Sequence, residues 1–180
     1  MKKTPVLGFT LIETMIAITI LTLAVSGAFM AANSALTVAE ISRGQLTASY
    51  LAQEGIEYVR KVRDDAYLFR YSQNDPTAST DGWSDFLAKV ASCSSANACA
   101  LDPIMGLQQC SSGICPLYIR SDGIYTLDSG SGSNTLTSFT RKIRTMKVSA
   151  TDEQASSTVS WNFHGQPYSI TVTDDLTPWQ

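Results

Sequence analysis

The sequence predicts an α+β fold in which one long N-terminal helix precedes an antiparallel β-sheet. The first sign is an uncharged apolar run from Thr14 to Ala39, about 26 residues, which as a helix of roughly 39 Å can cross a bilayer. The second is a helical repeat of apolar residues between Val38 and Val62. The third is a strict alternation of apolar residues around Trp161 and again around Ile170, which is typical of paired strands.

A short leader with distinctive residues precedes the apolar run. Lys2 and Lys3 open the chain, Gly8 precedes Phe9, and Glu13 is the fifth residue after that glycine. A carboxylate inside a membrane segment costs about 2.5–3.5 kcal/mol even on the insertion scale. Glu13 therefore needs a cationic partner, unless it lies close enough to the membrane surface to reach water.

The segment GFTLIE, residues 8–13, resembles the processing and methylation motif of type IV pilins and of the pseudopilins of type II secretion. In that family a prepilin peptidase cuts on the cytoplasmic side of the apolar segment and methylates the new N-terminus. The resemblance implies cleavage after Gly8 and a methylated amine on Phe9. It also implies that Glu13 pairs with the Phe9 amine of a neighbouring subunit in a filament.

The resemblance divides the chain into a leader (1–8), a membrane and assembly helix (9–63) and a globular head (64–180). Lysines before the apolar run and none just after it place the N-terminus in the cytoplasm. We therefore expect a single-pass protein of the cytoplasmic (inner) membrane with its head outside, and later a cell-surface pilus or periplasmic pseudopilus. The implied partners are the prepilin peptidase, other pilin subunits, an inner-membrane assembly platform with its motor ATPase, and lipid before assembly.

The region between residues 93 and 115 holds all four cysteines of the chain. An even number in an exported domain indicates disulfides, with three possible connectivities. We favour the local pairs Cys93–Cys99 and Cys110–Cys115, because each closes a short loop. A zinc site is the alternative, but the usual spacing of two to four residues within a ligand pair is absent.

The second half of the helix is predicted to pack under the head. Its apolar stripe comprises Val38, Ile41, Ala48, Leu51, Ala52, Ile56, Val59 and Val62. Glu57 and Lys61 are spaced for an ion pair. Residues 48–63 also resemble a subgroup of minor, or pilus-modification, pilins. Within the apolar half, Gly27 is the one candidate for local melting of the helix on assembly.

The head is predicted to be a loop (64–81), a short helix (83–90, starting near Asp81), an irregular cysteine region to Pro116, and then strands. The strands are a hairpin of residues 117–120 and 124–127, a strand over 138–150, and a second hairpin that turns at His164-Gly165. Together these strands form an antiparallel meander packed on the helix.

We find no set of residues that predicts an active site, a cofactor or a metal. His164 is the only histidine and sits in a predicted turn. Asp122-Gly123 and Asp174-Asp175 lack the spacing of a calcium loop and are better explained as turns. Trp83, Trp161 and Trp179 are expected to pack in the core.

Charge gives no support for nucleic-acid binding, because the net charge is −3 and removal of the leader makes it more negative. One basic cluster, Arg141, Lys142, Arg144 and Lys147, alternates along a predicted strand. It could touch DNA or a neighbouring head, but a solvated strand that protects a sheet edge is the simpler interpretation.

The sequence therefore predicts a structural subunit of a type IV pilus-like filament, with a minor or priming role, and not an enzyme. One alternative is a pseudopilin of type II secretion or of a DNA-uptake machine. Another is a secreted, disulfide-stabilised binding module whose apolar run is a cleaved signal, with residues 31–35 (AANSA) as the cleavage site. The apolar run is longer than a usual signal core, which disfavours that alternative.

Overall fold

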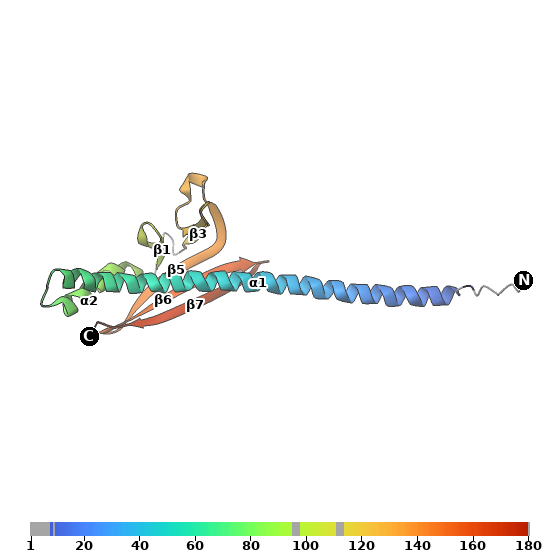
Figure 1. Cartoon of the computed structure of the whole chain (residues 1–180), viewed down its shortest axis with the longest axis horizontal. Helices are drawn as coiled ribbons and strands as arrows, with labels where there is room; N and C mark the ends of the chain where they lie inside the picture. The colour runs from blue at the N-terminus through green and yellow to red at the C-terminus, as the bar shows by residue number, and fades with distance from the viewer. Residues whose placement is uncertain (1–7, 9, 95–97, 111–113, 180) are drawn as a thin grey trace, which may run out of the picture. The chain divides into compact units, whose positions relative to one another are not determined.

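A computed structural model describes residues 8, 10–94, 98–110 and 114–179. The chain forms two compact units, one up to Arg43 and one from Gly44 onward. Helix α1 (Leu11–Ser72) supplies the first unit and runs into the second (Figure 1). The second unit contains an antiparallel seven-stranded sheet. The predicted α+β class, with a long N-terminal helix and an antiparallel head, is confirmed.

The predicted end of the helix near Arg63 is wrong, since α1 continues for nine more residues to Ser72. The segment predicted as a loop carries Ala66 and Tyr67, both buried in the core. Tyr67 stacks on Trp179, with ring centroids 5.3 Å apart and an interplanar angle of 6°. Burial of these side chains against the C-terminal residues prolongs the helix beyond its charged run, and the sequence pattern did not show that distant contact.

Helix α2 (Ala78–Val90) follows after a short turn and begins three residues before its predicted start at Asp81. Its inner side buries Trp83, Phe86 and Val90. Arg70 in the last turn of α1 donates from Nε to Asp85 at 2.7 Å, which joins the two helices. This hydrogen bond lowers the pKa of Asp85.

The sheet is built around one long central strand, β5 (Thr135–Ser149). One edge of β5 pairs with β6 (Asp152–Phe163), which pairs in turn with β7 (Gln166–Leu176). The other edge is shared by β1 (Cys99–Asp102) and β3 (Pro116–Ile119). Strands β2 (Gly106–Gln109) and β4 (Tyr125–Thr126) complete the sheet as hairpin partners of β1 and β3. The predicted meander is therefore present as β5–β6–β7.

The two predicted hairpin turns are also confirmed. His164 and Gly165 link β6 to β7. Both residues have a positive φ, as a two-residue hairpin turn of type I′ requires. Gly123, with φ +84°, lies in the turn between β3 and β4. By contrast, Asp174-Asp175 is not a turn: both residues lie in β7, where Asp174 accepts a hydrogen bond from Arg60 that lowers its pKa.

The cysteine region is more regular than predicted. Its described residues contain a 3₁₀ helix over Ala91–Ser94 and the β1–β2 hairpin. Its backbone pairs with β5 through Cys99 and Ile143, so the edge of the central strand orders this segment. That pairing joins residues more than forty positions apart, which local composition could not indicate.

Helix α1 and the sheet pack closely in the second unit. The buried stripe of α1 contains Ala48, Leu51, Ala52, Ile56 and Val59, which confirms the central part of the predicted stripe. Gly55 lies in the same stripe, and a Cβ at Gly55 would clash with the Ser157 hydroxyl of β6. A glycine is therefore required where the helix backbone passes over β6. Trp83 and Trp161 are buried and Trp179 is partly buried, as predicted.

The prediction of an edge strand for the basic cluster is wrong. Strand β5 is central, and Arg141 is completely buried between α1 and the sheet. Its guanidinium donates to the Leu51 carbonyl at 3.1 Å, the Leu101 carbonyl at 2.6 Å and the Glu54 carboxylate at 2.6 Å. Burial lowers the pKa of Arg141, and the negative charge of Glu54 opposes that effect. Arg141 thus ties α1 to β1 inside the core.

Candidate functional site

The predicted processing and assembly residues lie at the start of α1. Gly8 and Thr10 are exposed and precede the helix, which begins at Leu11. Phe9, the predicted methylated residue, lies outside the described residues. Glu13 is exposed in the first helical turn, where a carboxylate is favoured by the helix dipole.

Thr10 caps this helix. The backbone N–H of Glu13 donates to the Thr10 carbonyl at 3.1 Å and to the Thr10 hydroxyl at 3.3 Å. A threonine followed three residues later by glutamate is the sequence pattern of a capping box. Thr10 was not singled out by the sequence analysis, although this pattern was visible there. The cap places the helix start just after the predicted scissile bond, Gly8–Phe9.

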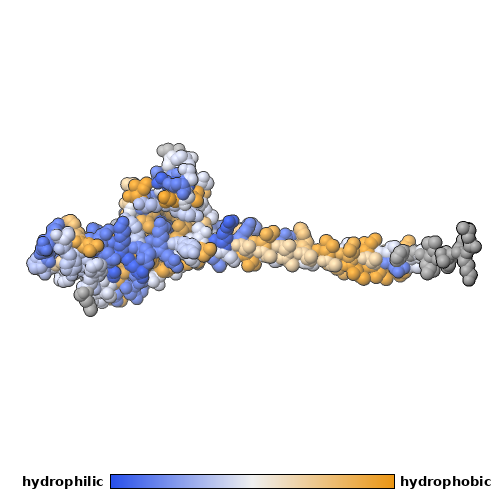
Figure 2. All heavy atoms as spheres, in the orientation of Figure 1, coloured by the Kyte–Doolittle hydropathy of each residue, from blue (hydrophilic) through white to orange (hydrophobic). Residues whose placement is uncertain are grey.

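The apolar half of α1 leaves its side chains uncovered. The large residues from Leu11 to Val38 are at least half exposed, and α1 is long and apolar enough to cross a membrane. Figure 2 shows this stretch as a nearly continuous hydrophobic surface. A surface of this size in water is unfavourable, so it requires lipid or other apolar helices around it.

Several hydroxyl side chains of this stretch bond to the backbone of their own helix. The hydroxyls of Thr14, Thr19 and Thr22 donate to carbonyls three residues earlier, and Ser26 donates to Thr22. Such bonds allow hydroxyl residues to enter an environment without water. Gly27 lies inside the continuous helix, and nothing in the described residues approaches the position of its missing Cβ.

The predicted ion pair between Glu57 and Lys61 is replaced by another. Glu57 pairs with Arg60 at 2.7 Å, and the Lys61 ammonium lies 5.7 Å from the centre of the Tyr58 ring. Arg60 also contacts Asp174 at 2.8 Å, so it links the exposed side of α1 to β7. Both partners of the Glu57–Arg60 pair are well exposed, and it contributes little to stability.

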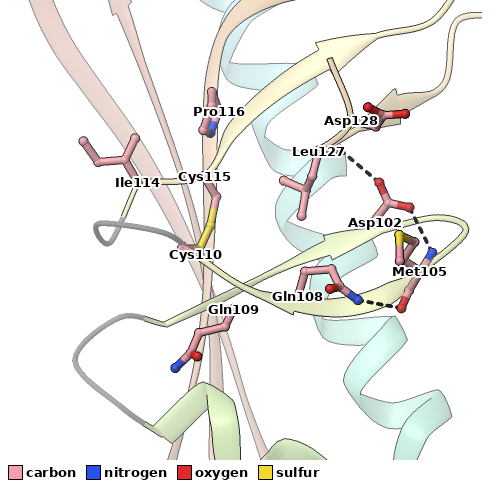
Figure 3. A pocket seen from close by; sticks show the side chains of 10 residues that line it. All are labelled: Asp102, Met105, Gln108, Gln109, Cys110, Ile114, Cys115, Pro116, Leu127 and Asp128. Carbon is pink, nitrogen blue, oxygen red and sulfur yellow. Dashed lines mark hydrogen bonds between the residues drawn. A yellow bond between two sulfur atoms is a disulfide. The ribbon is translucent and has the colours of Figure 1, made fainter. Parts of the chain in front are cut away.

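The cysteines are joined as Cys93–Cys99 and Cys110–Cys115, the two local pairs favoured from the sequence. The second bond lines a hollow of about 390 Å³ near the β1–β2 hairpin, with Met105, Ile114 and Leu127 nearby (Figure 3). Among the described residues there is no cluster of three or more histidine, cysteine, aspartate or glutamate side chains suited to a metal ion.

Asp102 is a buried carboxylate at the same hollow that the sequence analysis missed. It accepts hydrogen bonds from the Thr126 hydroxyl at 2.6 Å and from the backbone N–H groups of Ile104, Met105 and Leu127 at 2.9–3.0 Å. Figure 3 shows the bonds from Met105 and Leu127. Burial acts to raise the pKa of Asp102, but these four bonds together outweigh it and lower the pKa from 3.8 to about 2. Asp102 thereby fastens the β1–β2 turn to β4.

Asp102→Asn is expected to destabilise the head by about 2 kcal/mol at pH 7, because an amide NH₂ would face a hydrogen-bond donor. The pKa shift adds a pH signature. Since the folded pKa lies below the unfolded value, the stabilisation is complete above about pH 4 and is lost as the pH falls toward 2. Urea unfolding of the full chain in detergent, followed by tryptophan fluorescence, measures both effects. An asparagine variant that kept the wild-type midpoint at pH 7 would contradict this role.

Comparison with known proteins adds one match. Residues 6–29 match the model of the prokaryotic N-terminal methylation motif. No curated protein and no solved structure matches the chain. The match covers Gly8, Glu13 and the first part of the exposed apolar helix. The apolar helix and this motif together indicate membrane anchoring with the head outside. This chain thus carries the prepilin signature that is shared by type IV pilins and pseudopilins.

Proposed function

We propose that the chain is a structural subunit of a type IV pilus-like filament, cleaved after Gly8 and methylated on Phe9 by a prepilin peptidase. The observation that carries the proposal is the methylation motif at residues 6–29, followed without interruption by an exposed apolar helix. Helix α1 begins at Leu11, so the Gly8–Phe9 bond precedes both the helix and its Thr10 cap. Bonds near chain termini and outside packed elements are the preferred sites of proteolysis.

Assembly is proposed to bury the apolar half of α1 against the same segment of neighbouring subunits. Glu13 would then lie among helices and not in water, where its charge needs compensation. The Phe9 ammonium of a neighbour supplies that compensation. Glu13 thereby favours the assembled state over the subunit in the membrane and fixes the stagger between adjacent helices.

We further propose a minor or priming role, with an assembly platform, its motor ATPase and other pilins as partners. The support is the resemblance of residues 48–63 to minor pilins. Much of that stretch is the buried stripe of α1, including Leu51, Ile56 and Val59. The disulfides Cys93–Cys99 and Cys110–Cys115 are proposed to form after export, in an oxidising compartment.

The test is quantitative mass spectrometry of sheared filaments from cells that express this chain with its assembly machinery. A minor subunit is expected at a small fraction of the filament mass. If this chain forms most of the mass, it is a major subunit and the minor role is refuted. If it remains in the membrane while the cells lose protein secretion or DNA uptake on its deletion, it acts in a pseudopilus.

A further inference from the structure

At one end of the sheet of the head, the strands β5 and β6 separate from each other. Strands β5 and β6 pair, with one irregularity between Lys147 and Ser149, as far as Thr140 and Ser160, and beyond these residues they no longer pair. Beyond this point β5 continues to Thr135 alongside β3, whereas β6 continues to Phe163 alongside β7. Figure 1 shows β5 curving away from β6 in this part of the sheet. The two strands therefore diverge, and their facing backbone groups no longer pair with each other.

A hollow of about 470 Å³ lies at this divergence, and we name it the fork hollow. This volume is within the range of roughly 300–1,000 Å³ seen for small-ligand sites. Small polar side chains from all three strands of the meander line it: Ser138, Thr140, Ser160, Asn162 and Ser169. Among the described residues, no charged side chain lines the hollow, and Pro167 is the one exposed apolar residue there.

Several hydrogen-bonding groups of the fork hollow are not used within the described chain. The hydroxyls of Ser138, Ser160 and Ser169 have no hydrogen-bond partner among the described residues. Asn162 accepts from the Gly165 N–H at 2.8 Å through Oδ1, which leaves its NH₂ available. A ligand in the hollow thus meets groups that both donate and accept hydrogen bonds.

The floor of the hollow is rigid. Trp161 stacks on Tyr168 with ring centroids 5.5 Å apart, and Phe139 packs against Trp161 at 6.0 Å. These rings belong to a buried core cluster with Ala48 and Leu51 of α1. The polar side chains therefore stand on strands that are held in place by the core, which lowers the entropy lost when a ligand binds.

We propose that the fork hollow binds a neutral glycan. Uncharged groups that both donate and accept hydrogen bonds are complementary to the hydroxyls of a sugar. They carry no positive charge that could compensate the negative charge of a phosphate or a carboxylate. The nearest lysine on this face, Lys142, lies one row further along the sheet, opposite Thr158. A peptide strand is less well matched, because strand addition needs a continuous edge and pockets for side chains.

The experiment uses the full chain, purified in a detergent without a sugar headgroup so that the detergent does not compete. Binding to a panel of immobilised neutral oligosaccharides, ending in hexoses or N-acetylhexosamines, is measured directly. The double variant Ser160→Ala/Ser169→Ala removes the two hydroxyls and adds no bulk to the hollow. We expect affinity for the bound glycan to fall about tenfold or more.

The matched control is Thr171→Val/Thr173→Val, which removes two hydroxyls from β7 on the same face but outside the hollow. It is expected to bind like the wild type. The proposal is overturned if no neutral glycan binds, if both double variants bind equally, or if only charged glycans bind. If the added head of another pilin prevents the glycan from binding, the hollow would instead be assigned to a protein partner. None of these outcomes bears on N-terminal processing, so the proposed filament function is tested separately.

Discussion

Glu13→Gln is expected to reduce incorporation into filaments about tenfold or more while leaving the protein in the membrane at normal levels. The glutamine keeps the size of the side chain and its helix preference. It removes the negative charge that is proposed to pair with the Phe9 ammonium of a neighbour. The subunit can then still insert in the membrane, but the assembled state loses its main electrostatic advantage.

The matched control for this variant is Glu40→Gln, the same change at the first charge after the apolar run. Incorporation is measured by immunoblotting sheared filaments against the membrane fraction, with the N-terminal peptide analysed in parallel. Glu40→Gln should assemble normally, and both variants should start at methylated Phe9. Normal assembly of Glu13→Gln would refute the pairing, and an uncleaved leader in that variant would move the role of Glu13 to processing.

Arg141→Met is expected to destabilise the head by about 2–4 kcal/mol. Methionine fills most of the volume of the arginine stem, so the loss comes from the hydrogen bonds. The Leu101 carbonyl loses its 2.6 Å donor within the core, and the Leu51 carbonyl loses one donor. Glu54 contributes less to this cost, because its side chain is 46% exposed and can be hydrated.

Urea unfolding of the full chain in detergent measures this loss, and tryptophan fluorescence reports on the head because all three tryptophans lie there. Lys142→Met is the control, since the next residue of β5 points to the opposite face. Its effect should stay within about 0.5 kcal/mol. Equal midpoints for Arg141→Met and the wild type would show that the buried guanidinium adds no net stability.

Much of the fold followed from local patterns in the sequence. The uncharged run from Thr14 predicted the apolar half of α1, because length and composition alone decide whether a helix can cross a membrane. The alternation around Trp161 and Ile170 predicted β6 and β7, because the meander pairs neighbours in sequence. The signature around Gly8 and Glu13 was readable for the same reason, since all of its residues are contiguous.

What escaped prediction depends on contacts between distant residues. The end of α1 is set by the packing of Tyr67 on Trp179, and the β1–β2 hairpin is ordered by its contact with Ile143. Arg141 belongs to a run of basic residues that looks solvated, and only the central position of β5 buries it. Asp102 gives no sequence signal, because two of its four donors, Thr126 and Leu127, come from β4 and the residue after it, 24 and 25 positions along the chain.

The most direct test of the filament account is mass spectrometry of the mature N-terminal peptide, taken from the membrane or sheared-filament fraction. We predict a peptide that starts at Phe9 with one methyl group on its α-amine. A peptide that starts near Asn33 or Ala35 would mean that the apolar run is a cleaved secretion signal. In that case the roles proposed for Gly8, Glu13 and the apolar half of α1 would all be contradicted.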